Sequence, residues 1–234
     1  MDDMFIRSRA LLGVEKLNIL KNSHVCVVGI GGVGGYAVET LARAGVFNLT
    51  LVDHDVFAGS NLNRQLHALG STLGKSKAQT AKDRVLQINP HANVRAVEIM
   101  YSAQTREQIF DSPYDYIIDA IDLVTHKLDL IQTAICENIP IISALGTGNK
   151  LDAGRLKVTD ISKTHGCPLA KVMRKELRDR GINHLTVVFS DEEKRQKGAV
   201  GKPGEKFVPS IPWVPAVAGI LLAQHVCRDL TGEL

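Results

Sequence analysis

The sequence predicts an α/β fold, in which a mostly parallel β-sheet carries helices on both faces. Short apolar runs of strand length alternate with longer segments whose apolar residues recur at helical spacing, as is typical of strand–helix–strand units. One of these runs, His24–Val28, ends at a glycine-rich turn, and another, residues 49–52, ends at Asp53. With 234 residues, 44% of them hydrophobic and 23% charged, the chain can build one large core, so we expect a single domain over residues 1–234.

The first apolar run leads into a turn that suits a phosphate group. Residues 29–34 read Gly-Ile-Gly-Gly-Val-Gly, and apolar residues recur at helical spacing after them. Glycines let the backbone approach a phosphate closely, and the N-terminus of the following helix offers free N–H groups to an anion. The pattern predicts a Rossmann-like strand–turn–helix unit with nucleotide contacts at Gly29, Gly31, Gly32 and Gly34.

The second run is followed by an acid in the position of a ribose ligand. Asp53 comes about twenty residues after the glycine turn, where a carboxylate accepts hydrogen bonds from ribose hydroxyls. Taken alone, this combination is more typical of NAD-binding dehydrogenases than of enzymes that use ATP. A glycine-rich turn also occurs simply as a tight connection, so the motif by itself leaves these alternatives open.

Two cations after Asp53 favour ATP chemistry. Arg64 stands in the segment Asn61-Leu62-Asn63-Arg64-Gln65, and Lys77 ends the segment Gly74-Lys75-Ser76-Lys77, which opens a helix predicted to run to Ile88. Attack of a carboxylate on the α-phosphorus of ATP builds negative charge on phosphate oxygens and on the departing pyrophosphate, and fixed cations stabilise that charge. A dehydrogenase has little use for these cations, so we expect Arg64 and Lys77 to be catalytic rather than solvated surface charges.

A third run, Tyr116–Asp119, places carboxylates at the edge of the sheet where ligands bind in open α/β folds. Asp119 ends this run and Asp122 follows it. Because Mg²⁺ prefers oxygen ligands, Asp122 is the candidate metal ligand. The alternative is that Asp122 caps the helix predicted over residues 127–135.

The second half of the chain continues the pattern less regularly. Strands are predicted at residues 140–144, 155–161 and 185–190, a basic helix at 167–180 and a last helix at 214–230. Residues 191–207 combine charges and glycines without an apolar period, which predicts a mobile loop that either closes over a substrate or is a solvated connection. Trp213 precedes the last helix, and we expect burial of its ring rather than stacking on a base.

Cysteines and charge narrow the range of functions. The four cysteines form no CxxC pair, so neither a zinc site nor a disulfide framework is predicted, and we expect Cys26 and Cys136 to be buried thiols. The net charge of +3 is small, but basic residues gather late in the chain, which suits a polyanionic partner. No apolar stretch is long enough to cross a bilayer, so we expect a cytoplasmic protein without membrane contact.

Several of these segments together resemble the ubiquitin-activating-like superfamily, which includes enzymes that adenylate sulfur-carrier proteins. They are the glycine turn, the Asp53/Asp55 pair, residues 61–65, Lys77 and residues 119–122. Within this superfamily, residues 140–143, 146–152 and 167–174 resemble the tRNA threonylcarbamoyladenosine dehydratases. The resemblance covers residues 5 to 230, and the missing CxxC pairs favour this branch over the zinc-containing activators of sulfur carriers.

The resemblance implies the ubiquitin-activating-like fold and the site residues. The parallel sheet would be extended by largely antiparallel strands, with a nucleotide-binding half near residues 22–150 and a substrate half near 151–234. The implied contacts are Asp53 on the ribose, Asn61 and Arg64 on the phosphates, Asp55 and Lys77 at the nucleotide, and Asp122 on Mg²⁺. Arg7 would act in the partner subunit's site of a homodimer, with Arg9 as the alternative.

The resemblance also implies the reaction. ATP would adenylate the side-chain carboxylate of threonylcarbamoyladenosine in tRNA, and the ureido nitrogen of the modification would then close a hydantoin ring. Basic residues of the second half would contact tRNA phosphates, and a sulfur-transfer protein is a possible partner. Ring closure needs no enzyme thiol, which disfavours a nucleophilic Cys167. The alternatives are adenylation of the C-terminus of a ubiquitin-like sulfur carrier, and an NAD dehydrogenase or nucleotide-sensing module.

Overall fold

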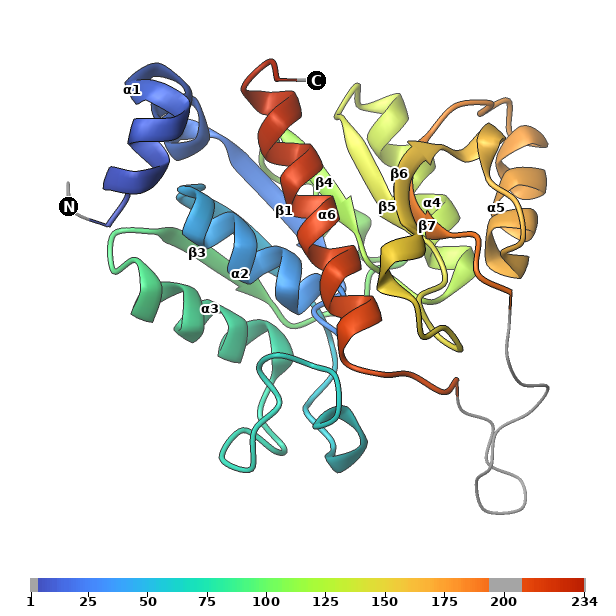
Figure 1. Ribbon diagram of the computed structural model, residues 1–234, viewed down its shortest axis with the longest axis horizontal. Coiled ribbons are helices and arrows are strands. Elements are labelled where there is room, and N and C mark those ends of the chain that lie inside the picture. The colour runs from blue at the N-terminus through green and yellow to red at the C-terminus, as the bar shows by residue number, and fades with distance from the viewer. Residues whose placement is uncertain (1–3, 194–207, 234) are drawn as a thin grey trace.

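The centre of the molecule is a seven-stranded sheet, which the computed structural model describes within residues 4–193 and 208–233 (Figure 1). Its strand order is β3-β2-β1-β4-β5-β7-β6. The strands are β1 (His24–Val28), β2 (Asn48–Val52), β3 (Asn93–Val97), β4 (Tyr116–Asp119), β5 (Ile141–Ala144), β6 (Leu156–Asp160) and β7 (Thr186–Ser190). The predicted α/β class with a mostly parallel sheet is therefore confirmed.

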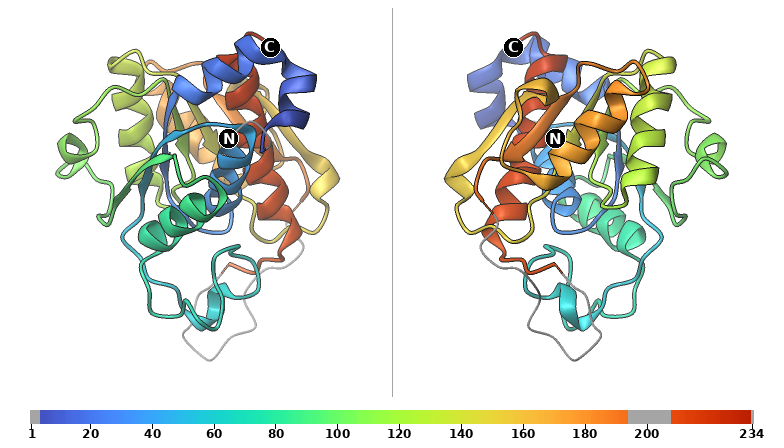
Figure 2. Two further views of the ribbon diagram at one scale, coloured as in Figure 1. Left: turned by 90° about the vertical axis from the view of Figure 1, so that its left-hand side faces the viewer. Right: turned by 90° about the vertical axis from the view of Figure 1, so that its right-hand side faces the viewer.

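Helices cover both faces of the sheet (Figures 1 and 2). They are α1 (Ile6–Asn22), α2 (Gly34–Ala44), α3 (Lys77–Ile88), α4 (Val124–Cys136), α5 (Pro168–Arg178) and α6 (Trp213–Leu230). The helices α2, α3 and α6 pack on one face, and α4 and α5 pack on the other. Residues 191–193 are the only part of the predicted mobile loop that lies within the described residues.

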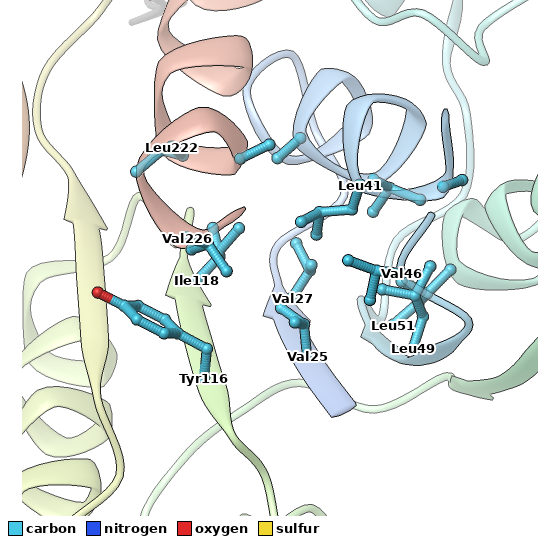
Figure 3. Close-up of a cluster of buried hydrophobic side chains, with 14 of the residues drawn as sticks. Val25, Val27, Leu41, Val46, Leu49, Leu51, Tyr116, Ile118, Leu222 and Val226 are labelled. Carbon is cyan, nitrogen blue, oxygen red and sulfur yellow. The ribbon is translucent and has the colours of Figure 1, made fainter. Parts of the chain in front are cut away.

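Alternating side chains of β1 divide the core into two clusters. Val25 and Val27 pack with Leu41 of α2 and Leu222 of α6 on one face, as Figure 3 shows. Cys26 faces the other cluster, which α4 and α5 cover. Side chains on a strand alternate between the two faces, so a strand covered by helices on both sides must be apolar on both, as β1 is from Val25 to Val28.

The extension of the sheet differs from the prediction. It was expected to be largely antiparallel, but β7 pairs in parallel with β5, with Ser143 opposite Val187. Among the strands of the described residues, only the last of the order, β6, is antiparallel, and it pairs with β7. The chain forms β6 at the edge of the sheet first, and then returns through α5 to form β7 between β5 and β6. The order of the strands along the sequence does not predict this exchange of positions.

Two further residues differ from the expectations. Cys26 is fully buried as predicted, but Cys136, in the last turn of α4, is exposed. Trp213 was expected to be buried, yet 48% of its surface is exposed. In the described residues, we find no helix with the length and apolar character needed to span a membrane.

Candidate active site

A cavity of about 560 Å³ opens at the carboxyl edge of the sheet. It is lined by the glycine turn, by the loops that follow β2, β4 and β5, by the first residues of α3 and α5, and by the segment around the start of α6. The sheet order reverses between β1 and β4, because the chain proceeds from β1 outward to β3 and then crosses to β4. Ligands of open α/β sheets bind at such a switch point.

The four predicted glycines divide into two kinds. A Cβ atom on Gly29, which has φ 93°, would lie 2.6 Å from the carbonyl oxygen of Ala120, and one on Gly34 would collide with the carbonyl of Gly29. These two glycines therefore allow β1, α2 and the loop after β4 to pack closely. Gly31 and Gly32 line the cavity and have room for a Cβ, so they are the glycines that leave space for a ligand.

Asp53 lines the cavity and orders its wall. One carboxylate oxygen accepts a hydrogen bond from the N–H of Ile30 at 2.6 Å, and the other accepts one from the N–H of Asp55 at 2.8 Å. Each oxygen keeps a further lone pair for a ligand hydroxyl. The side chain thus links the glycine turn to the loop after β2, in addition to facing the space where the predicted ribose would lie.

Lys77 and Asp55 form an ion pair at the same wall. The ammonium of Lys77 donates to Asp55 Oδ2 at 2.7 Å, and the lysine side chain is buried whereas that of Asp55 is half exposed. Partial burial tends to raise the pKa of Asp55, but the hydrogen bond and charge of Lys77 outweigh burial and hold this pKa below its ordinary value. The ion pair therefore holds Lys77 in place beside the cavity.

Arg64 and Asn61 lie on the loop between β2 and α3, and both line the cavity. The guanidinium donates to the carbonyl of Ser60 at 2.8 Å and to the side chain of Asn63 at 2.9 Å. Within the part of the chain that the structure describes, no carboxylate pairs with Arg64, so its charge is not neutralised. The side chain of Asn61 accepts a hydrogen bond from Ala58 at 3.1 Å and so fixes this loop.

Asp122 and Asp119, which the sequence placed together, have different surroundings. Asp122 is exposed at the cavity and, among the described residues, forms no ion pair. It does not cap α4, because the cap position is Leu123 and no side chain accepts a hydrogen bond there. Asp119 is fully buried and bonds to Lys127 at 2.6 Å and to Ser143 at 2.7 Å, so it is not available as an exposed ligand.

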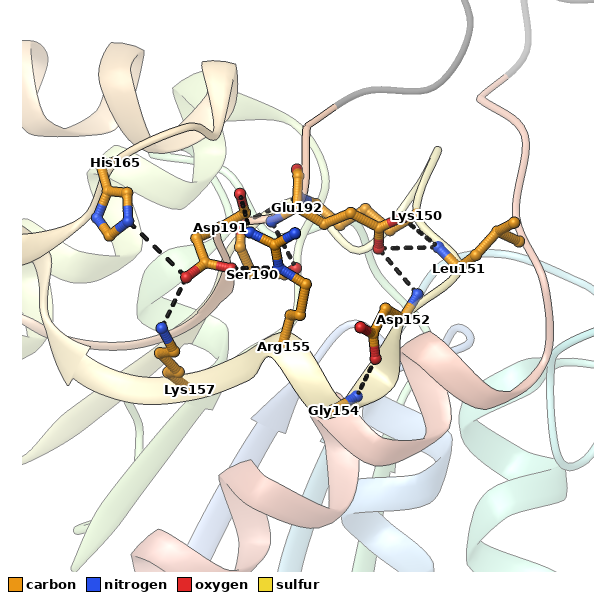
Figure 4. A network of polar contacts seen from close by, with 10 residues as sticks. All are labelled: Lys150, Leu151, Asp152, Gly154, Arg155, Lys157, His165, Ser190, Asp191 and Glu192. Atoms are coloured by element: carbon orange, nitrogen blue, oxygen red, sulfur yellow. Dashed lines mark hydrogen bonds and ion pairs between the residues drawn. The ribbon is translucent and has the colours of Figure 1, made fainter.

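The loop after β5 also lines the cavity, and it contains a residue that was not selected from the sequence. Buried Lys150 donates to the carbonyls of Ser190 and Glu192 at 3.0 and 2.7 Å (Figure 4). Burial lowers the pKa of Lys150, although the nearby Cys167 and Glu192 oppose this effect. The carboxylate of Glu192 accepts hydrogen bonds from the N–H groups of Leu151 and Asp152, so the end of β7 is tied to the loop after β5. The only signal in the sequence was the segment 146–152 itself.

Cys167 and Arg7 complete the set of residues singled out by the sequence. Cys167 is buried and lines the cavity, and its Sγ would lie 3.6 Å from a Cβ on Gly146. Arg7 is exposed on α1 and does not line the cavity of its own chain. The geometry therefore gathers all the other predicted site residues except Gly34 around one space.

Known proteins are similar to this sequence, some of them over almost its full length. A model of the ThiF family matches residues 5–233. The chain belongs to the ThiF family. Within it, the tRNA threonylcarbamoyladenosine dehydratase of Bacillus subtilis is 43% identical over 98% of this chain and 95% of its own length. The dehydratase of Escherichia coli is 40% identical over 74% of this chain and 65% of its own length.

Solved structures of the ThiF family agree with the fold. The E. coli tRNA N6-threonylcarbamoyladenosine dehydratase TcdA, in complex with AMP, superposes with a TM-score of 0.91 and 32% identity, over 99% of this chain and 95% of that one. Its complex with ATP gives a TM-score of 0.89 and 33% identity over the same shares of the two chains. This member of the ThiF family therefore falls among the tRNA threonylcarbamoyladenosine dehydratases.

Proposed function

We propose that the chain catalyses the ATP-dependent dehydration of threonylcarbamoyladenosine in tRNA to its cyclic hydantoin form. The observation that carries the proposal is the cavity, which brings the glycine turn, the cations of Arg64 and Lys77 and the carboxylate of Asp122 around one space. The B. subtilis relative, with 43% identity over nearly the whole of both chains, supports the choice of substrate.

The residues of the nucleotide side fit ATP. Gly31 and Gly32 leave the space that phosphates need, and Asp53 has lone pairs left for ribose hydroxyls. Arg64 has no carboxylate partner within the described residues, so its positive charge is available to phosphate oxygens. We assign Asp53 to the ribose, and Asn61, Arg64 and Lys77 to the phosphates.

The first step is adenylation. An oxygen of the substrate carboxylate attacks the α-phosphorus of ATP, the bond to the β-phosphate breaks, and pyrophosphate leaves with the electron pair. Negative charge grows on the α-phosphate and on the departing oxygen, and preorganised cations in a partly buried site stabilise this charge more than water does. Arg64 and Lys77 supply those cations.

The second step is ring closure within the substrate. The ureido nitrogen attacks the acyl carbon, the bond from that carbon to the AMP oxygen breaks, and the nitrogen loses a proton. One substrate oxygen leaves in AMP, which accounts for the net loss of water. Nucleophile and electrophile belong to the same side chain, so the protein chiefly holds them in a reactive conformation and excludes water.

Asp122 fits a Mg²⁺ ligand, because its carboxylate is exposed at the cavity and unpaired among the described residues. When bound, the ion would supply positive charge to the phosphates of ATP. Titration calorimetry of Mg²⁺ in the presence of a non-hydrolysable ATP analogue tests this assignment. Asp122→Asn is expected to weaken Mg²⁺ binding, and an unchanged affinity would refute it.

We also propose a homodimer in which Arg7 enters the partner's site. Arg7 lies outside the cavity of its own chain, and α1 exposes apolar side chains that a second copy would cover, notably Leu11 at 85% and Val14 at 60%.

A cytoplasmic location and contact with a sulfur-transfer protein are further proposals, which cell fractionation and co-purification test. Recovery in the membrane fraction, or no co-purification, would count against them.

Basic residues of α5 are the proposed contacts for tRNA phosphates. Lys171, Lys175 and Arg178 are exposed along one side of this helix, whose first residues line the cavity. Arg174 is engaged with Thr164 and Arg180 with Glu176, and Lys175 lies 3.7 and 3.6 Å from the carboxylates of Glu176 and Asp179, so Lys171 and Arg178 are the freer charges. Lys171→Ala with Arg178→Ala should weaken tRNA binding and reduce its salt dependence, whereas an unchanged salt dependence would remove α5 from the interface.

An isotope experiment tests the proposed reaction directly. A tRNA whose modified side chain carries heavy oxygen in its carboxylate should transfer one labelled oxygen to AMP, because that oxygen bonds to the α-phosphorus. Lys77→Ala should reduce AMP release about 10²- to 10³-fold, in keeping with the loss of one charge-stabilising group. Lys75→Ala is the matched control, since Lys75 is exposed just before α3 and does not line the cavity. Label recovered in pyrophosphate or water would refute adenylation.

A further inference from the structure

Trp213 is an exposed aromatic residue beside the cavity. It is the first residue of α6, and 48% of its surface is accessible. The other described phenylalanines and tyrosines are buried or half-buried. A large ring that is exposed to solvent at the start of a helix contributes little to the core. Contact with a binding partner therefore explains its position better than a role in stability.

The indole of Trp213 is held in place by the rim of the cavity. Its Nε1–H donates to the carbonyl of Leu151 at 2.6 Å. The N–H of Asn149 donates to the carbonyl of Pro209 at 2.6 Å, and the side chain of Asn63 donates to the carbonyl of Ser210 at 3.0 Å. These bonds join the segment before α6 to the loop after β5 and to the loop of Arg64, so the ring has a defined place.

The surroundings of Trp213 connect it to the reaction site. Ser210 and Pro215, which flank it in the chain, line the cavity, and so does Lys150, which precedes its hydrogen-bond partner Leu151. Trp213 itself is not among the lining residues. The ring therefore lies at the rim, outside the space assigned to ATP and the reacting nucleoside.

The chemistry of the ring identifies the class of partner. The indole N–H is already bonded within the protein, so an apolar, flat face is what remains to be offered. Unpaired bases in RNA loops are recognised by stacking on such aromatic faces. The positive end of the α6 dipole lies beside the ring and favours a nearby phosphate.

We propose that Trp213 stacks on an unpaired base next to the modified nucleoside of the tRNA substrate. The inference rests on the proposed function, because the reacting nucleoside must sit in the cavity for its neighbour to reach the rim. Trp213 would determine RNA affinity and the placement of the loop, and take no part in adenylation or ring closure.

The protein provides its own reporter, because Trp213 is the single tryptophan of the chain. Intrinsic fluorescence is followed while an RNA stem-loop that carries the modified nucleoside is added, and separately while ATP is added alone. Stacking predicts quenching with the RNA that saturates at its binding concentration, and little change with ATP. An unchanged signal at saturating RNA would overturn the proposal.

Two variants separate stacking from the hydrogen bond. Trp213→Leu should raise KM for the RNA roughly 10- to 100-fold with kcat and ATP affinity nearly unchanged, as expected for the loss of one base stack. Trp213→Phe retains an aromatic face but loses the bond to Leu151, and should restore most of the affinity. Equal KM values for wild type and Trp213→Leu would overturn the proposal.

Other outcomes distinguish this inference from its rivals. One such outcome is an emission wavelength of Trp213 that shifts with protein concentration and not with RNA. That shift, together with a changed oligomeric state in Trp213→Leu and an unchanged KM, would assign the ring to a protein interface and refute stacking. Saturable quenching by the RNA without any hydantoin product would support Trp213 as a base contact while the proposed reaction failed.

Discussion

A lysine without exposed surface lies behind the loop after β4 that lines the cavity. Lys127 of α4 pairs with Asp119 at the end of β4, and both bond to Ser143 of β5. The second oxygen of Asp119 accepts the N–H of Ile121 at 3.1 Å, so the buried group also orders the loop that carries Asp122. Removing one member of a buried pair leaves the other charge without compensation.

Lys127→Met is therefore expected to lower the free energy of unfolding by about 3–5 kcal/mol. Urea denaturation measures this change. The double variant Lys127→Met with Asp119→Asn removes both charges and should recover a substantial part of the loss. If Lys127→Met were as stable as the wild type, the ion pair between Lys127 and Asp119 would not contribute to stability, contrary to this account.

His67 predicts how stability depends on pH. Burial lowers its pKa to about 4, although Glu39 opposes this effect. The unfolded chain binds a proton near the ordinary pKa of 6.5, whereas the folded chain resists protonation, so the contribution of His67 is complete above pH 6.5 and is lost as pH falls toward 4. The full loss is roughly 3 kcal/mol.

Urea denaturation between pH 7 and pH 5 tests this effect in the wild type and in His67→Gln. The wild type should lose more stability over this range than the variant does. His24 and His225 also have pKa values lowered by burial, so some slope should persist in the variant. Identical slopes in the two proteins would contradict the assignment to His67.

Single residues were predictable where a motif carries the chemistry. Asp53 and Asp122 follow strands, Lys77 opens a helix and Arg64 stands in the segment 61–65, and all four line the cavity. The buried contacts of Lys127 were not predictable, because they require α4 to pack on the end of β4 and β5 to lie beside β4. Trp213 was predicted wrongly, since the apolar pattern of its helix gave no indication that the first ring lies outside the core.

At the scale of elements, the packing of α6 on α2 depends on one glycine. A Cβ on Gly219 would lie 2.9 Å from the Cβ of Tyr36 and collide with the carbonyl of Val33. Gly219→Ala should force the helices apart and lower the free energy of unfolding by about 1–3 kcal/mol. Thermal or urea denaturation measures the loss.

Gly70→Ala is the matched control, because nothing lies within 4 Å of the added Cβ at Gly70. It should leave stability unchanged or raise it slightly, since alanine restricts the unfolded chain more than glycine does. If both variants unfold like the wild type, the close contact between α2 and α6 has no energetic importance.

Most elements followed from apolar periodicity, and two did not. The helix α3 ends at Ile88 as predicted, and α2 follows the glycine turn as expected. The helix α4 contains the predicted residues 127–135, and α5 and α6 differ from their predicted bounds by one or two residues. The helix α1 was missed because it is only weakly amphipathic and is broken at Gly13, where φ is 82°. The strand β3 was missed because it lies at the sheet edge and includes the charged Arg95, which pairs with Asp111.

For the molecule as a whole, the proposed homodimer predicts complementation between inactive variants. Arg7→Ala and Lys77→Ala should each lower activity, but a mixed dimer has one site with both residues intact. Equal mixing with subunit exchange should restore about a quarter of wild-type activity, because half the dimers are mixed and each has one complete site. No recovery after verified exchange would place Arg7 outside the partner's site.

The central claim is the dehydration of threonylcarbamoyladenosine, and one measurement tests it most directly. The protein is incubated with ATP, Mg²⁺ and tRNA bearing this nucleoside, and the digested nucleosides are analysed by mass spectrometry alongside an AMP assay. We expect a nucleoside lighter by one water, with AMP formed in matching amount. No change in mass, with pyrophosphate exchange triggered instead by a ubiquitin-like protein, would contradict the claim and point to activation of a sulfur carrier.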